Sequence, residues 1–268
     1  NKGVEFSLGG SIISKRDFSW SANFNITTQK NVVTALANNN ADMLIATAGL
    51  ESVSLIRVGE SIGSFYLEET KGNNPANGQR VFVQLIKDAN GNVTGTQDVQ
   101  YNHAAPSASR WTKVSDGTPV RGASQTADGQ VFGPALPKWF GGLDNTVRYK
   151  GFDLNFLLFF SGGNYVYNGT KAGLHDNRNW NNGKDALDRW TKPGENAKWP
   201  RVVFGDNVSN GSGLTISNNV EKGDFLKVRN ITLGYNLPAS VAQKAKLNNV
   251  RLYVAAFNAL TFTGCEGF

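Results

Sequence analysis

Hydrophobic and polar residues alternate with a period of two over several long segments of the chain. From Asp17 to Thr27 the even-numbered positions are apolar and the odd-numbered positions are polar. From Gly151 to Ser161 the even positions are again apolar, and Leu157 and Phe159 interrupt the polar side. Successive side chains of a β-strand point to opposite faces, so the pattern predicts strands whose two faces meet different surroundings.

Seven long strands are predicted along the chain, some from this alternation and others from motifs described below. They lie near Val4–Gly10, Asp17–Thr27, Ser61–Thr70, Trp139–Tyr149, Phe152–Ser161, Phe225–Asn236 and Val250–Leu260. The longest have about eleven residues, which exceeds the usual length of about 5–6 in globular sheets and matches the 9–11 residues of a tilted transmembrane β-strand. Strand length therefore favours a membrane barrel.

The connections between these strands are of two kinds. Tyr149–Phe152 and Thr28–Asn31 predict short reversals, whereas two long polar segments, about 71–138 and 162–222, contain many Gly, Asn, Asp and Pro residues. A shorter linker, Leu237–Asn249, is expected on the side of the short turns. Short turns on one side and long loops on the other are typical of outer-membrane barrels.

Two fold classes remain open from the alternation alone, a membrane barrel and a soluble β-sandwich. Aromatic residues at the ends of the apolar stretches, such as Trp20, Tyr149 and Tyr235, fit either a membrane interface or a soluble core. The second class would make the chain a secreted or surface carbohydrate-binding or adhesin module. Long strands with one wholly apolar face argue against it.

Composition narrows the choice further. Charged residues make up only 18%, with 30 Gly, 16 Phe, 7 Tyr and 6 Trp, which argues against both disorder and a helical bundle. The net charge is +6, but the basic residues are scattered, so no nucleic-acid partner is expected. No apolar run approaches the ~20 residues of a membrane helix, and no secretory signal opens the chain.

Little catalytic or metal chemistry is predicted. The single cysteine, Cys265, has no partner for a disulfide or zinc site, and His103 and His175 lie far apart and fit best as solvated loop residues. Glu68 and Glu69 offer paired carboxylates for a hydrolase, but no supporting group accompanies them. The chain is therefore expected to be no enzyme and to carry neither metal nor cofactor.

Several motifs carry a family resemblance. The segment from Gly133 to Leu143, with Asn145-Thr146 and Tyr149-Lys150-Gly151-Phe152-Asp153-Leu154, resembles the G-x-x-x-P-x-x-x-G-G-x-x-N-T…Y-K-G-F-D-L pattern of SusC/RagA-type TonB-dependent transporters. Asp188–Gly194 with Pro200-Arg201, and Val220–Pro238 with Arg251-Leu252-Tyr253 and Asn258, are similar to the same family, as is Val58–Tyr66. The matches keep their order along nearly the whole chain.

The resemblance implies an all-β, antiparallel transmembrane β-barrel segment with long extracellular loops, part of a 22-stranded plugged barrel. Seven strands are too few to close it, so residues 1–268 are expected to be the C-terminal part of the barrel, truncated at both ends and without the plug domain. Cys265 stands where the family commonly has an aromatic residue. Lys227 and Arg229 share the parity of the apolar stripe and are therefore expected above the hydrocarbon, at the long-loop end.

The function that the resemblance implies is TonB-dependent uptake of glycans or peptides across the outer membrane. The expected partners are a SusD-like surface lipoprotein, TonB acting through the missing part, the remaining barrel strands and plug, lipid and lipopolysaccharide, and the substrate. Loop aromatics and neighbouring polar residues are the candidate substrate or lid contacts: Trp111, His175, Asp176, Asn177, Arg178, Asn179, Trp180, Trp190 and Trp199. Ordinary loop packing is the alternative for each, and most of all for Trp190, which lies inside a family motif.

Overall fold

The computed structural model describes residues 1–37, 39–46, 51–178, 181–211 and 214–266. The chain folds into two compact units. Unit 1 consists of Asn1–Val32, Leu136–Tyr165 and Lys222–Phe268, and unit 2 consists of Val33–Ala135 and Val166–Glu221.

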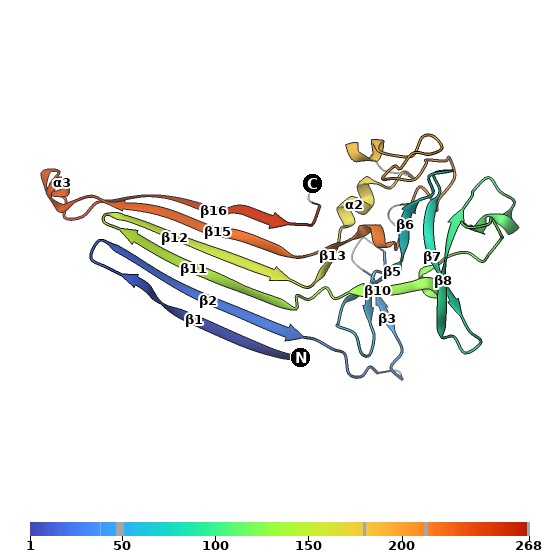
Figure 1. The fold of residues 1–268 in the computed structure, drawn as a ribbon, viewed down its shortest axis with the longest axis horizontal. Coiled ribbons are helices and arrows are strands. Elements are labelled where there is room, and N and C mark those ends of the chain that lie inside the picture. Colours follow the sequence, from blue (N-terminus) through green and yellow to red (C-terminus); the bar gives the residue numbers. More distant parts are fainter. Residues whose placement is uncertain (38, 47–50, 179–180, 212–213, 267–268) are drawn as a thin grey trace. The chain divides into compact units, whose positions relative to one another are not determined.

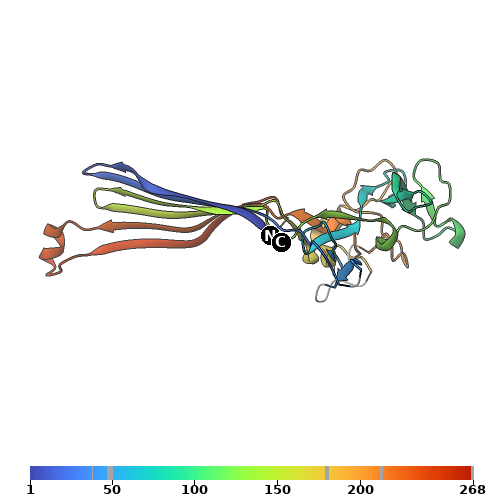
Figure 2. The same cartoon turned by 90° about the horizontal axis from the view of Figure 1, so that it is seen from below.

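Unit 1 is an antiparallel sheet of six strands in the order β1-β2-β11-β12-β15-β16. The strands are β1 (Lys2–Ser14), β2 (Phe18–Lys30), β11 (Trp139–Tyr149), β12 (Phe152–Gly162), β15 (Phe225–Asn236) and β16 (Arg251–Thr263). Figures 1 and 2 show this order in perpendicular views. Each strand has 11 to 13 residues, so each is long enough to cross a bilayer at a tilt.

Three hairpins join the strands of unit 1 in pairs at one end of the sheet (Figure 1). The β11–β12 hairpin turns at Lys150 and Gly151, with Tyr149 opposite Phe152, as predicted. The β15–β16 connection contains the short helix α3 (Ala239–Lys244). The reversal predicted at Thr28–Asn31 is wrong, because β2 continues to Lys30, which lies opposite Lys2, and the chain reverses after Ser14 instead.

The strand expected at Ser61–Thr70 does not belong to this sheet. Only Ser64–Glu68 forms a strand, β5, and it pairs with β4 (Ser54–Ile56) and β10 (Gly129–Gly133) inside unit 2. Five residues are too few to cross a bilayer, and three of the five are buried. The first long excursion between barrel-type strands therefore begins at Asn31, directly after β2, rather than near residue 71.

Unit 2 is built from the two excursions that connect β2 to β11 and β12 to β15. Its larger sheets have the strand orders β10-β5-β4-β3 and β6-β7-β8-β9, and β13 pairs with β14. The further strands are β3 (Met43–Ile45), β6 (Thr70–Asn73), β7 (Arg80–Lys87), β8 (Val93–Tyr101), β9 (Trp111–Lys113), β13 (Tyr165–Tyr167) and β14 (Val220–Lys222). The helices are α1 (Gln125–Asp128), α2 (Gly169–Leu174), η1 (Ser107–Ser109), η2 (Lys184–Leu187) and η3 (Ser217–Asn219).

A shared core holds the two excursions together. Phe82 and Val99 from the first excursion and Ile216 from the second are almost fully buried against one another. Phe82 and Ile216 lie 134 positions apart in the sequence, yet each is no more than 1% exposed. The excursions are thus one folded unit rather than separate loops. Among the described residues, no helix has both the length and the apolar character that crossing a membrane requires.

Candidate functional site

The six-stranded sheet of unit 1 has one apolar face. Residues opposite one another in an antiparallel pair share a face, so the register assigns each side chain. The face contains Val4, Phe6, Leu8, Phe18, Trp20, Ala22, Phe24, Ile26, Leu143, Val147, Leu154, Phe156, Leu158, Phe160, Leu226, Val228, Ile231, Leu233, Leu252, Val254, Ala256, Leu260 and Phe262. Many of these side chains are exposed, including Leu8 at 66% and Val254 at 76%. An exposed apolar surface of this extent requires an apolar environment.

Aromatic rings lie toward both ends of this face. At the hairpin end Phe152 and Tyr235 have ring centroids 4.4 Å apart. At the other end Phe160 contacts Trp139 at 6.0 Å and Phe24 at 6.2 Å. Phe24 and Phe156 lie near the middle of β2 and β12, so aromatic rings also occur between the two ends.

Asn145 is an amide that the register places on this apolar face. It lies between Ala22 and Phe156, is 3% exposed, and its Oδ1 accepts a hydrogen bond of 3.2 Å from Trp20 Nε1. The amide is therefore covered by the indole ring and shielded from its surroundings.

The opposite face of the same sheet is polar and internally hydrogen-bonded. Thr146 Oγ1 donates to Asn155 Oδ1 at 2.8 Å, and Asn155 Nδ2 donates to Asp153 at 3.4 Å. Arg251 binds both carboxylate oxygens of Asp153, at 2.6 and 3.1 Å. Gly234 leaves the room for this ion pair, since a Cβ there would lie 2.4 Å from Arg251 Nη2.

A β-bulge changes the predicted position of two cations. Val228 lies opposite Leu158 but Asn230 lies opposite Leu157, so Arg229 is an extra residue in β15. The bulge reverses the parity, and Lys227 lies opposite Phe159 on the polar face rather than on the apolar stripe. Lys227 Nζ lies 4.8 Å from the ring centroid of Phe225, and Arg229 Cζ lies 5.7 Å from that of Phe159.

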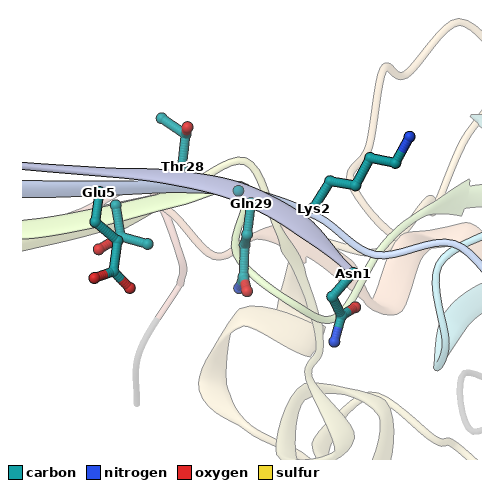
Figure 3. A pocket seen from close by; sticks show the side chains of 7 residues that line it. Asn1, Lys2, Glu5, Thr28 and Gln29 are labelled. Carbon is teal, nitrogen blue, oxygen red and sulfur yellow. The ribbon is translucent and has the colours of Figure 1, made fainter.

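A shallow hollow lies along the first residues of β1 and the last residues of β2. Figure 3 shows that Lys2 and Thr28 project from one side of the strand pair and that Glu5, Gln29 and Asn1 project from the other. The side with Lys2 and Thr28 is continuous with the apolar face, because Val4 lies opposite Thr28. Basic and acidic groups are therefore separated onto different faces at this end of the sheet.

The loop residues predicted to bind substrate or lid lie in unit 2, and several of them are buried. His175 is 1% exposed and stacks on Trp199, with ring centroids 3.9 Å apart and an angle of 18°. The His175 Nδ1 lies 2.8 Å from the Lys171 carbonyl oxygen, and its Nε2 forms a short contact with Asp185. His175 is therefore not the solvated loop residue that the sequence suggests, and neither ring is available to a ligand in this structure.

The neighbouring polar residues form a tight turn. Asp176 is 2% exposed and binds Arg178 through both carboxylate oxygens, and these hydrogen bonds raise the pKa of Arg178. Asn177 donates its side-chain amide to the His175 carbonyl at 3.3 Å. Arg178 retains an exposed fraction of 27% and is the most accessible of these charged groups. Asn179 and Trp180 lie outside the described residues.

Two further candidate tryptophans have internal packing partners. Trp111 packs edge-on against Phe82 at 5.4 Å and against Tyr101 at 5.3 Å. Trp190 donates from Nε1 to the Pro75 carbonyl at 2.9 Å, and its ring covers Gly78, whose φ is 70°. Both rings are half-buried, which agrees with packing inside unit 2.

Arg80 is a charged residue of unit 2 that the sequence did not mark as buried, although it is only 1% exposed. Its guanidinium donates to the carbonyls of Gly211 at 3.2 Å and Ser209 at 3.4 Å. Burial lowers the pKa of Arg80 to about 10, while the nearby carboxylates of Asp176 and Asp206 oppose this change. No local pattern marked this residue, since Arg80 to Gln84 are buried on both faces of β7.

The geometry of the unit 1 sheet defines the class of protein. Long antiparallel strands with an exposed apolar face, a hydrogen-bonded polar face, short hairpins at one end and large excursions at the other form a segment of a transmembrane β-barrel wall. No protein-family model matches the chain.

Relatives in sequence identify the family. The chain is 31% identical to TonB-dependent receptor P3 of Formosa agariphila over 100% of its own length and 24% of that protein. It is 29% identical to receptor P39 of the same organism, over 100% of the chain and 27% of the relative. It is 26% identical to TonB-dependent receptor SusC of Bacteroides thetaiotaomicron over 88% of the chain and 20% of that receptor.

The fold agrees with these relatives. The RagAB peptide importer in its open-open state superposes with a TM-score of 0.70 at 20% identity, covering 99% of this chain and 25% of that one. A further structure of the RagAB peptide transporter gives 0.69 at 21% identity, over 99% and 26%. The chain belongs to the SusC/RagA-type TonB-dependent receptors and spans about a quarter of the length of the relatives it matches.

Proposed function

We propose that this chain forms part of the barrel wall and of the extracellular loops of an outer-membrane importer, which takes up glycans or peptides with energy from TonB. The observation that carries the proposal is the two-faced sheet of unit 1. Its apolar face includes side chains such as Leu8 and Val254 that are more than 60% exposed. A bilayer is the environment that such a face requires, and the polar face then lines the lumen.

The orientation follows from the connections. At one end of the sheet two hairpins have short turns and the β15–β16 connection, residues 237–250, is somewhat longer, while the far larger excursions that form unit 2 leave the strands at their other end. In outer-membrane barrels short turns face the periplasm and long loops face the cell exterior. Unit 2 would therefore lie outside the cell, where it meets substrate and a SusD-like surface lipoprotein.

Burial separates the predicted loop residues into supporting residues and one accessible residue. His175, Asp176 and Trp199 support the loop from inside, since each is no more than 3% exposed. Arg178 is the residue of this cluster through which contact with a polar substrate or with the lipoprotein is proposed. Trp111 and Trp190 keep unit 2 packed, and no bond-making or bond-breaking chemistry is assigned to the chain.

Cysteine accessibility on intact cells tests the location and the orientation. In a cysteine-free full-length protein, Leu187→Cys places a thiol at a side chain that is 74% exposed in unit 2, and Lys150→Cys places one in a hairpin turn of unit 1. A membrane-impermeant maleimide should label the first on intact cells and the second only after lysis. Labelling of Lys150→Cys on intact cells, or recovery of the protein in the soluble fraction, would refute the proposal.

Transport and partnership need separate tests. Deletion of TonB should abolish uptake of the glycan or peptide on which wild-type cells depend, while the protein remains in the outer membrane. A tagged full-length protein should co-purify with a SusD-like lipoprotein. Arg178→Ala should weaken that complex or the uptake without lowering the amount of protein, whereas the buried Trp199→Ala should lower the amount itself.

A further inference from the structure

The apolar face of unit 1 bears charged side chains at one place. Among the described strand residues in regular register, Lys2 and Lys30 are the charged residues of this face, and neither Asp nor Glu lies on it. They come from different strands, β1 and β2, and lie directly opposite each other. Both are exposed.

This pairing is unfavourable without a counter-charge. Like charges directly opposite on neighbouring antiparallel strands repel, because their Cβ atoms are only about 5 Å apart. Glu5, the acidic residue of the neighbouring hollow, lies on the other face of the strand pair (Figure 3). Among the ion pairs formed by the described residues, none contains Lys2 or Lys30.

The surroundings of the two lysines suit a phosphate group on a lipid. A shallow hollow beside them is lined by Lys2, Gly3, Val4, Thr28, Gln29 and Lys30, and the Thr28 side chain lies on the same face as both lysines. Below the lysines the same face continues with Val4, Phe6 and Ile26. A ligand that carries an anionic head and apolar chains would match both parts of this surface.

We propose that Lys2 and Lys30, with Thr28, bind the phosphate of an anionic outer-leaflet lipid of the lipid A type. Lysine binds phosphate as a compact point charge, and two lysines can flank one phosphate from opposite sides. The acyl chains lie on the apolar side chains of β1 and β2. The inference rests on the proposed function, because the lysine end must face the outer leaflet.

The test uses the full-length protein in nanodiscs and lipid A as the probe, with retained lipid A measured by native mass spectrometry. The Lys2→Gln/Lys30→Gln variant should bind lipid A about thirtyfold more weakly, since each lysine near an anionic lipid surface contributes about fivefold. The matched control is Lys15→Gln/Arg16→Gln, which removes two positive charges from the other end of the same hairpin and should leave binding unchanged. Equal binding by the wild type and the Lys2/Lys30 variant would overturn the proposal.

Further arms separate the possible sources of the signal. Dephosphorylated lipid A should bind like the variant, whereas inorganic phosphate at millimolar concentration should compete only weakly. Full competition by inorganic phosphate would identify a free-anion site and overturn the lipid assignment. Lys30→Glu should also lose lipid A while the hairpin remains folded, because Lys2 then faces an opposite charge.

Failure of the proposed lipid site can be distinguished from failure of the proposed function. A wild-type protein that enters the outer membrane with unit 2 outside but does not discriminate lipid A from its dephosphorylated form contradicts the lipid site alone. A protein that does not enter the membrane contradicts the proposed function itself.

Discussion

Glu68 should make the stability of unit 2 depend on pH near neutrality. Burial raises the pKa of this carboxyl group from 4.5 to about 7, and Asp128 adds to the increase, while the hydrogen bond of 3.3 Å from Thr215 Oγ1 opposes it. Because the pKa is higher in the folded state, folded unit 2 retains the proton that the unfolded chain loses above pH 4.5. The contribution of Glu68 to stability is therefore fully present below pH 4.5 and is lost as the pH rises to about 7.

The size of the effect follows from the two pKa values. Each pH unit between them corresponds to about 1.4 kcal/mol, so deprotonation of Glu68 lowers the free energy of unfolding by up to about 3 kcal/mol. Glu68→Gln keeps the shape and stays neutral, so it should remove this loss. At pH 8 the variant should be more stable than the wild type, and at pH 4 the two should be similar.

Hydrogen exchange of the full-length protein measures this difference locally. Peptides that cover β5 and β7 should open more readily at pH 8 than at pH 5, after correction for the intrinsic pH dependence of exchange. Glu69→Gln is the matched control on the next residue, where the side chain accepts a hydrogen bond from Gln130 at 2.9 Å, and it should keep the wild-type profile. An unchanged pH profile in Glu68→Gln would refute the reasoning.

Three further predictions concern packing and register. Trp111→Ala should destabilise unit 2 by about 3–5 kcal/mol in the same exchange experiment and Trp111→Phe by much less, whereas a purely ligand-binding tryptophan would leave protection unchanged. Asn145→Leu alone should lower the temperature at which the barrel loses its compact form on gels, because Trp20 Nε1 loses its hydrogen-bond acceptor. Adding Trp20→Phe should restore most of the lost thermal stability. Additive losses in the double variant would contradict a direct coupling between the two side chains. Deletion of Arg229 should impair outer-membrane insertion less than deletion of Thr232, since both flanks of the bulge already match β12 and only the pairing with β16 must shift; a greater loss from the Arg229 deletion would argue against the bulge.

All six strands of unit 1 were predicted, with ends that differ by a few residues. Alternation marks β2 and β12 most clearly, because one face of each is apolar along nearly its full length. Unit 2 was not predicted as a folded unit. β7 is buried on both faces over its first five residues, so its sequence shows no alternation, and β5 has only five residues.

For the candidate loop residues, the sequence again indicated the segment but not the contacts within it. The sequence places His175 and Trp199 in one polar excursion, but their stacking depends on a contact across 24 positions that no local pattern encodes. Arg80 was overlooked because a charged residue at the start of a strand is usually exposed. Its burial depends on backbone carbonyls of Ser209 and Gly211, which belong to the other excursion.

The bulge at Arg229 shows why parity alone is an unsafe guide to the face of a strand. A shift of one residue moves every following side chain to the opposite face. Counting back from Ile231 puts Lys227 on the apolar stripe, where a cation would be costly near the middle of a bilayer, by about 2–4 kcal/mol. The extra residue at Arg229 instead puts Lys227 opposite Phe159 on the polar face and Val228 on the apolar one. The same register argument supports the assignment of Lys2 and Lys30 to the apolar face. The bulge in β1 lies between Ser11 and Ile13, far from both lysines, and it leaves their shared face unchanged.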